Sequence, residues 1–173
     1  MTVERPADAA DESLWRPLRK LLQAMDDDIS RLYRERGIGI QPSHSMVIIR
    51  LAAAGSMTIR ALADSLAITH SAASQKVSAL RTGGYVIDTA GEDLRTKVIS
   101  LTERGAELAP FLAAEWLATE SACADLEREL PYALSRVVED MREALQRSPF
   151  YDRIVARIDA NPPGPSRPAP GTR

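Results

Sequence analysis

The sequence predicts a mainly α-helical protein that carries one small β-hairpin. Apolar residues make up 45% of the 173-residue chain and aromatic residues only 5%, with frequent alanine and leucine, which are strong helix formers. Over most of the chain, apolar residues recur three or four positions apart, as on one face of an α-helix. Between residues 85 and 101 this spacing gives way to the β-branched, alternating pattern typical of strands.

Charge and cysteine content exclude several classes of protein. The 22 basic and 24 acidic residues give a net charge of −2, so the chain is not a polybasic nucleic-acid coat. Its single cysteine, Cys123, cannot form an internal disulfide and cannot build a metal cage alone. No apolar run approaches the ~20 residues that span a bilayer, and residues 1–8 lack the apolar core of a secretory signal. We therefore expect a cytoplasmic protein with no membrane partner.

The first expected element is a helix over residues 13–37, preceded by a disordered N-terminus at 1–12. Ser13 is a suitable N-cap and Gly37 a suitable stop. The apolar residues of this segment form one stripe: Leu14, Leu18, Leu21, Leu22, Met25, Ile29 and Leu32. Such a stripe needs a surface to pack against.

A second helix is expected from Pro42 to just before Gly55. Proline suits the first position of a helix, because its missing N–H would have no partner there, and glycine suits the end. Between them lie the apolar residues that would face a core: Met46, Val47, Ile48, Ile49 and Leu51.

Two shorter helices follow in close succession. Thr58 is placed to cap a helix over 58–66, and after a tight break at 67–68 a further helix runs over 69–82. Two glycines at 83–84 end it.

Residues 85–87 and 97–101 form the expected hairpin, with a long polar tip between them. Two helices joined by a short turn and followed by a hairpin make a winged helix-turn-helix, here spanning residues 40–101. In this motif the first helix braces the second, so that the second can enter the major groove of DNA.

The remainder of the chain is expected to be helical up to a proline-rich tail. A long helix should run from 102 to about 130, with a kink at Pro110. Helices near 132–147 and 150–159 each begin just after a proline. Residues 161–173 hold five of the eleven prolines, and we expect them to be disordered.

The helix at 69–82 divides into an apolar and a polar side. Ala73, Val77 and Leu80 are expected to face the core. The polar side would face solvent or DNA: Thr69, His70, Ser71, Ser74, Gln75 and Ser78. Hydroxyl, amide and imidazole groups can hydrogen-bond to base edges and phosphates. Polarity alone favours an ordinary solvated face, whereas the order of helices, turn, glycine stop and hairpin favours DNA binding.

Two segments in the middle of the chain carry a more specific pattern, TIRALADSLAITHSAASQKVSALRTGGYV and EDLRTKVISLTERGAEL. The second contains D-x-R at 93–95 and, after alternating apolar residues, L-T-x-x-G at 101–105. In this order and spacing, the helix pair and both motifs resemble the MarR family of bacterial transcription regulators over residues 42–108.

The resemblance implies an obligate homodimer that binds double-stranded DNA. In the family, the first and last helices of each subunit interlock, and two winged domains occupy successive major grooves of a pseudo-palindrome. Residues 13–37 and 102–160 would then be dimerisation helices. The resemblance also implies a transcription regulator, most often a repressor. A small aromatic or amphipathic effector would bind between the DNA-binding and dimer layers and release the protein from its operator.

Lys76 in the helix is a further DNA-binding candidate, and the resemblance adds Arg95 and Lys97 in the wing. Asp93 would orient Arg95 rather than contact DNA, because phosphates repel a carboxylate. Many relatives carry arginine in place of Gln75 and an apolar residue in place of Lys76. Since glutamine prefers adenine and arginine prefers guanine, we expect a different operator preference.

The other chemistry-bearing residues have simpler interpretations. Trp15, His44 and Trp116 are candidates for the border of an effector pocket, although His44 would more simply cover a helix start and the tryptophans a dimer core. Cys123 lacks basic neighbours that would lower its pKa, which favours a packed helical cysteine over a redox sensor. His44 and His70, with no associated cysteine, do not make a metal site. We expect no metal and no cofactor.

Two other classes of function compete with this one. The sequence contains no glycine-rich phosphate loop, no G-x-S-x-G and no H-E-x-x-H motif, so we do not expect an enzyme. The alternative is a winged-helix module that binds proteins and has lost DNA binding. The near-neutral centre of the chain and Gln75, where relatives carry arginine, favour this alternative.

Overall fold

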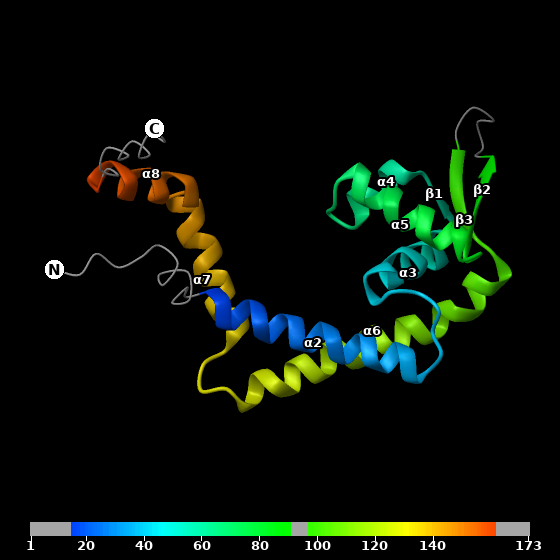
Figure 1. Ribbon diagram of the computed structural model, residues 1–173, viewed down its shortest axis with the longest axis horizontal. Helices are drawn as coiled ribbons and strands as arrows, with labels where there is room; N and C mark the ends of the chain where they lie inside the picture. Colours follow the sequence, from blue (N-terminus) through cyan, green and yellow to red (C-terminus); the bar gives the residue numbers. More distant parts are fainter. Residues whose placement is uncertain (1–14, 91–96, 162–173) are drawn as a thin grey trace, which may run out of the picture. The chain divides into compact units, whose positions relative to one another are not determined.

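The computed structural model describes residues 15–90 and 97–161. The chain forms two compact units, Met1–Leu117 and Ala118–Arg173, and each is described separately below; Figure 1 gives the order of the elements. Several predictions lie outside the described residues: the disordered ends, the cap at Ser13, and the wing residues Asp93 and Arg95.

The first unit opens with helix α2, Trp15–Glu35. Its apolar stripe is buried towards the C-terminal end of the helix and exposed towards the N-terminal end. Tyr33, near the C-terminal end, is 2% exposed and belongs to the core, with Ile29 packed against it. Trp15, Leu18, Leu21 and Leu22 remain exposed, so the described residues of the first unit do not bury the N-terminal half of the stripe.

The second predicted helix begins as a single 3-10 turn, η1 (Pro42–His44), which continues directly into α3 (Ser45–Ala54). Val47, Ile48 and Leu51 on α3 are fully buried, as the apolar run in the sequence predicts, whereas Met46 and Ile49 are half-buried. Gly55 ends α3 with φ +77°, a backbone conformation that favours glycine, and its N–H donates to the carbonyl of Leu51 at 2.8 Å.

Helices α4 (Ile59–Ser65) and α5 (His70–Thr82) form the predicted helix-turn-helix. Thr58 and Thr69 cap them: each hydroxyl accepts a hydrogen bond from the backbone N–H three residues later, at 3.0 and 3.2 Å. The turn between the helices holds Ala67 at φ +52°, so a non-glycine residue supplies the left-handed bend here.

The wing is part of a three-stranded antiparallel sheet of order β1-β3-β2. β2 (Val86–Ala90) pairs with β3 (Lys97–Leu101), with Val86 opposite Leu101 and Ala90 opposite Lys97. β1 (Ser56–Met57) pairs with the far edge of β3. The sequence analysis missed β1, because two residues are too short to show a strand period.

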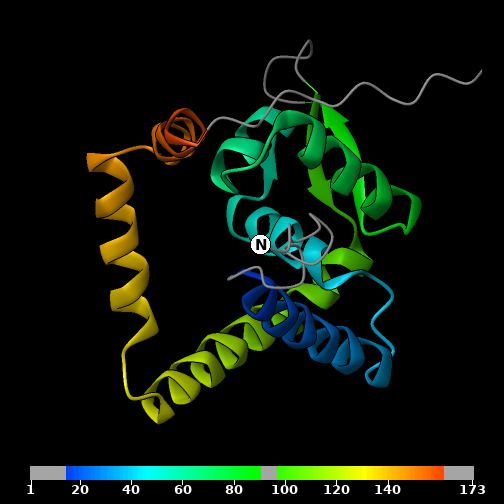
Figure 2. The ribbon, with the colours of Figure 1, turned by 60° about the vertical axis from the view of Figure 1, so that its left-hand side comes forward.

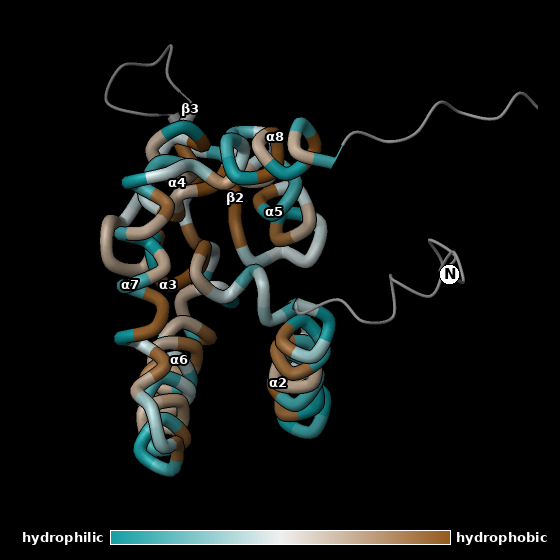
Figure 3. The backbone as a smooth tube through the Cα atoms, turned by 90° about the vertical axis from the view of Figure 1, so that its left-hand side faces the viewer, coloured by the Kyte–Doolittle hydropathy of each residue, from teal (hydrophilic) through white to brown (hydrophobic). Residues whose placement is uncertain are grey.

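One core unites these elements. α3 lies between the α4–α5 pair and α2 (Figures 1 and 2). The buried residues come from α2, α3, α4, α5, the sheet and the start of α6: Tyr33, Val47, Ile48, Leu51, Leu62, Val77, Leu80, Tyr85, Val86, Ile99, Ala109 and Leu112. Figure 3 shows brown, hydrophobic stretches of backbone along α3 and β2 of this unit. The predicted mainly α fold with a small hairpin wing is confirmed.

Helix α6 (Glu103–Glu129) leaves β3 after a single residue, Thr102, and runs from the first unit into the second. The Thr102 hydroxyl donates to the carbonyl of Gly84 at 2.7 Å and accepts from the N–H of Gly105 at 3.2 Å. The helix continues through Pro110 without a break.

The second unit contains the end of α6 with α7 (Leu134–Arg147) and α8 (Phe150–Ala160). No residue of α7 or α8 is buried. Arg153 holds the two together by donating to the carbonyls of Ser148 and Ala144, each at 2.9 Å. None of the helices in the described ranges is both long and apolar enough to cross a bilayer.

Cys123 departs from its prediction. It is exposed, not packed, because the buried residues of α6 all precede it: Gly105, Ala109 and Leu112. Among the described residues of the second unit, nothing buries α6 at this position.

Candidate nucleic-acid interface

Helix α5 is the candidate recognition helix, the one expected to enter the major groove, and it is buried on one side and exposed on the other. Ala73, Val77 and Leu80 are buried as predicted, and they recur at the four- and three-residue spacing of one helix face. Thr69 and His70 are exposed at its N-terminal end, where the first backbone N–H groups and the helix dipole favour anions.

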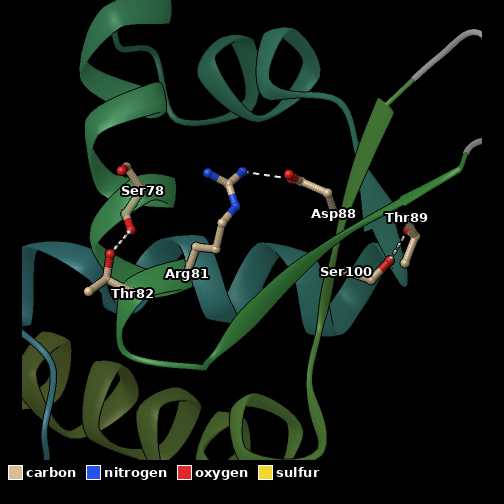
Figure 4. A network of polar contacts seen from close by, with 6 residues as sticks. All are labelled: Ser78, Arg81, Thr82, Asp88, Thr89 and Ser100. Carbon is tan, nitrogen blue, oxygen red and sulfur yellow. Dashed lines mark hydrogen bonds and ion pairs between the residues drawn. The ribbon is translucent and has the colours of Figure 1, made fainter.

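Opposite the buried side runs an exposed stripe made of Ser71, Gln75, Ser78 and Thr82, spaced four, three and four residues apart. The first three were predicted from the sequence. Thr82 was not, although the same periodicity would have included it. Its hydroxyl donates to the carbonyl of Ser78 at 3.1 Å (Figure 4). Ser74 is half-buried on the flank of the helix.

An ion pair ties the recognition helix to the wing. The guanidinium of Arg81, in the last turn of α5, donates to the Asp88 carboxylate on β2 at 2.6 Å (Figure 4). Both side chains are about two-fifths exposed, at 41% and 44%. Thr89 and Ser100 hydrogen-bond across the strands at 3.0 Å. Sequence reasoning missed the Arg81–Asp88 pair, since its partners belong to different elements.

The base of the wing is packed around Tyr85, which is 4% exposed. The Arg104 guanidinium lies over its ring, 4.4 Å from the centroid, and donates to the carbonyl of Gly83 at 2.9 Å. A Cβ at Gly105 would lie 2.1 Å from the Tyr85 carbonyl oxygen. The glycine of the L-T-x-x-G motif is thus required by close contact between α6 and the wing base.

The tip of the wing lies outside the described residues, so Asp93 and Arg95 are not placed. Lys97 is the first residue of β3, and only its backbone is described. The wing contacts to DNA remain a prediction.

Lys76 occupies a different position from the exposed stripe. It is half-buried, and its Nζ donates to the carbonyl of Ser43 in η1 at 2.6 Å. Burial, and then the neighbouring charge of Lys76, lower the pKa of His44 below its ordinary value.

Acidification is expected to destabilise the fold through His44. Because its pKa is lowered in the folded protein, the unfolded chain binds the proton more tightly. As the pH falls, the loss of stability begins near the ordinary histidine pKa of about 6.5. It grows until the pH drops below the lowered pKa of His44 in the folded protein. Thermal unfolding from about pH 7.5 to about pH 5 should show a smaller decline in Tm for His44→Gln than for the wild type. His70→Gln is the matched control, and equal declines in His44→Gln and wild type would contradict the expectation.

Helix α2 is joined to α6 by a polar contact at the edge of the core. The Tyr33 hydroxyl donates to the Glu115 carboxylate at 3.0 Å, and Ser45, itself buried, hydrogen-bonds to the same hydroxyl. Burial, followed by the charge of Glu115, raises the pKa of Tyr33 far above its ordinary value, so this phenol remains a donor.

An apolar groove of about 530 Å³ lies in the first unit between α3, β3 and α6. It is lined by Ile49, Leu51, Ala52, Gly55, Leu101, Ala106, Ala109, Pro110 and Ala113. The predicted effector residues Trp15, His44 and Trp116 are not among them. No group of three or more His, Cys, Asp or Glu side chains that could hold a metal ion occurs in residues 15–90 and 97–161.

No protein-family model matches the chain, and no curated protein gives a significant sequence match. Solved structures do match it. The transcriptional regulator SlyA aligns with a TM-score of 0.58 at 13% identity, over 78% of this chain and 93% of SlyA. A MarR family transcriptional regulator from Silicibacter pomeroyi DSS-3 aligns with a TM-score of 0.55 at 21% identity, over 78% and 96%.

A MarR family transcriptional regulator from Listeria monocytogenes, solved in complex with a 26-mer DNA, aligns with a TM-score of 0.53 at 16% identity. The alignment covers 79% of this chain and 89% of that one. The chain therefore has a MarR-like winged-helix fold, as the sequence motifs predicted.

Proposed function

We propose that this chain is a sequence-specific DNA-binding transcription regulator that acts as a homodimer on a pseudo-palindromic operator. The observation that carries the proposal is α5: a capped helix, buried on one side, that exposes Ser71, Gln75, Ser78 and Thr82 in one stripe. Hydroxyl and amide groups on an exposed helix suit the donor and acceptor pattern of the major groove.

Different parts of the interface take different roles in this proposal. Gln75 and Ser71 read base edges, and Thr69 and His70, with the N–H groups of the first turn, approach a phosphate. The wing residues Arg95 and Lys97 meet the backbone or the narrow minor groove beside it, with Asp93 orienting Arg95. The Arg81–Asp88 pair holds the wing strand to the recognition helix.

The proposal of a dimer is supported by large apolar side chains that are exposed in the described residues. They lie on the first half of α2, on α6 beyond its buried part and just after its end, and on α7 and α8: Trp15, Leu18, Leu21, Leu22, Trp116, Leu117, Leu126, Leu130, Leu134, Val137, Val138, Met141, Leu145, Phe150, Tyr151, Ile154 and Ile158. An exposed apolar surface of this extent favours association, and a second copy supplies the same faces.

In this proposal the protein is a repressor that a small effector releases from DNA. The dimer blocks transcription by occupying its operator, and a small aromatic effector shifts the equilibrium towards a spacing of recognition helices that no longer fits DNA. The apolar groove between α3, β3 and α6 supports an effector of this kind, because its size and lining suit an apolar ring.

The test is selection of bound sequences from a random duplex library with the purified protein. A palindromic enriched site is expected, together with affinity that falls steeply as salt rises, because Lys and Arg contacts to phosphates release counterions. A winged-helix module that binds only proteins would enrich no sequence and show no salt-dependent retention on duplex DNA.

Gln75→Ala is expected to relax base preference at particular positions of the selected site. A good bidentate contact discriminates by about 1–3 kcal/mol between bases, which a binding assay on single-base variants resolves easily. Gln23→Ala, which removes another exposed glutamine from α2, is the matched control. If Gln75→Ala kept every base preference of the wild type, the assignment of the outward face would be wrong.

A further inference from the structure

Lys76 lies on the flank of α5 that faces η1. It directly precedes the buried Val77 and is itself half-buried, whereas the neighbouring Gln75 is exposed. Its Nζ donates to the carbonyl of Ser43, 33 residues earlier in the chain, at 2.6 Å. The ammonium group is therefore engaged with the protein's own backbone, to one side of the exposed stripe.

The segment that Lys76 contacts contains no carboxylate. Ser43 and His44 lead into the N-terminus of α3, the positive end of that helix dipole. Neither η1 nor the first turn of α3 contains an acidic residue. The neighbouring Lys76 charge also disfavours protonation of His44. The contact that holds the ammonium group here is thus a hydrogen bond to a backbone carbonyl.

Ser43 belongs to a segment that is tied to the other helices of the unit. η1 contacts α2, and Ser45, which follows it, is buried and hydrogen-bonds to Tyr33. Tyr33 in turn donates to Glu115 on α6. Polar contacts thus extend from the recognition helix through η1 to both α2 and α6.

We propose that Lys76 is a positioning residue for base reading: by binding the Ser43 carbonyl it fixes the orientation of α5 against η1, and it does not contact DNA. This inference rests on the proposed function and differs from the assignment of Lys76 to the DNA-binding set that the sequence suggested. A lysine bound to phosphate contributes to the salt dependence of binding. A lysine that positions α5 contributes to discrimination between sequences and leaves the salt dependence unchanged.

The experiment compares three variants with the wild type. Lys76→Met removes the ammonium group and keeps an unbranched stem, Lys76→Arg keeps a charged donor, and Lys20→Met removes a lysine from the exposed surface of α2. Affinity is measured over a series of salt concentrations for the selected palindrome and for a scrambled duplex of equal length. Amide hydrogen exchange is measured on each unbound protein.

For Lys76→Met we expect about fivefold weaker binding to the palindrome, nearly unchanged binding to the scrambled duplex, and an unchanged salt slope. Amide exchange should accelerate in η1 and α5. Lys76→Arg should restore the palindrome affinity to within about twofold of wild type, and Lys20→Met should match the wild type in both duplexes.

Two results would overturn the inference while leaving the proposed function intact. One is a salt slope that falls by about one unit per subunit with both duplexes, which marks a phosphate contact. The other is unchanged discrimination or unchanged amide exchange in η1 and α5. Lys76→Gln replaces Lys76→Met if the latter is insoluble. A wild-type protein that does not distinguish the two duplexes would overturn the proposed function and this inference together.

Discussion

Replacing Gly105 by alanine is expected to lower the free energy of unfolding by about 3 kcal/mol. A Cβ at this position would lie 2.1 Å from the carbonyl oxygen of Tyr85 and 3.1 Å from its carbonyl carbon. Both atoms belong to the backbone, and the same carbonyl accepts the N–H of Thr102 at 3.1 Å, so it cannot move without breaking that bond. Relieving the overlap would separate α6 from the wing base, and overpacking of this kind usually costs about 1–3 kcal/mol, occasionally more.

The direction in which Gly105→Ala changes the free energy of unfolding decides whether this overlap exists. Within a helix, alanine is favoured over glycine by about 1 kcal/mol, so helix propensity alone predicts a more stable variant. Chemical denaturation of Gly105→Ala distinguishes the destabilisation expected from the steric overlap from the stabilisation expected from helix propensity. Equal slopes of the unfolding free energy against denaturant concentration in variant and wild type would show that both undergo a similar unfolding transition. Gly37→Ala is the control, because a Cβ there meets nothing within 4 Å although its φ is +66°; it should cost only about 1 kcal/mol. A stable Gly105→Ala would mean that α6 does not approach the wing base closely.

Removal of residues 1–36 is expected to abolish the soluble folded protein. The deletion takes away α2 and with it Tyr33, one of the largest fully buried side chains. Glu115 loses the hydrogen bond from the Tyr33 hydroxyl, and α3 and α6 lose the packing of Ile29 and Tyr33 at the edge of the core. Deleting a buried aromatic alone costs about 3–5 kcal/mol, which is comparable to the whole stability of many domains.

Size-exclusion chromatography and the cooperativity of thermal unfolding check this expectation. Tyr33→Phe, which removes only the hydroxyl and its hydrogen bond, should fold and lose about 1–2 kcal/mol. Removing residues 162–173, a proline-rich stretch with almost no apolar residues, should leave Tm nearly unchanged. A truncated protein that begins at residue 37 and remains a soluble, stable, DNA-binding monomer would rule out both the packing role of α2 and the proposed dimer.

Features set by local interactions were predictable from the sequence. Thr58 and Thr69 could be identified as helix caps because a cap binds an N–H only three residues away. The inward positions Ala73, Val77 and Leu80 followed from helix periodicity, and so did most of the exposed stripe. The hairpin was visible because its two strands are long enough to show β-branched, alternating sequence.

Features set by contacts between distant segments were not predictable in this way. Nothing in the sequence around Lys76 shows that its ammonium group reaches Ser43, and a lysine in a recognition helix is naturally assigned to DNA. The Arg81–Asp88 pair depends on how the helix and β2 are turned relative to each other. Cys123 was expected to be packed because it lacks the basic neighbours of a reactive thiol, but burial depends on which surface of α6 another segment covers.

The position of Tyr85 has a consequence for how related sequences can diverge. A Cβ at Gly39 would lie 2.7 Å from the Tyr85 hydroxyl oxygen, and one at Gly83 would lie 2.9 Å from the ring. Both overlaps involve the side chain, so a homologue with a smaller residue at position 85 is free to carry alanine at 39 or 83. The overlap at Gly105 involves the backbone carbonyl instead, and no substitution of the tyrosine relieves it. Positions 39, 83 and 85 should therefore covary, while position 105 should stay glycine whatever the others become.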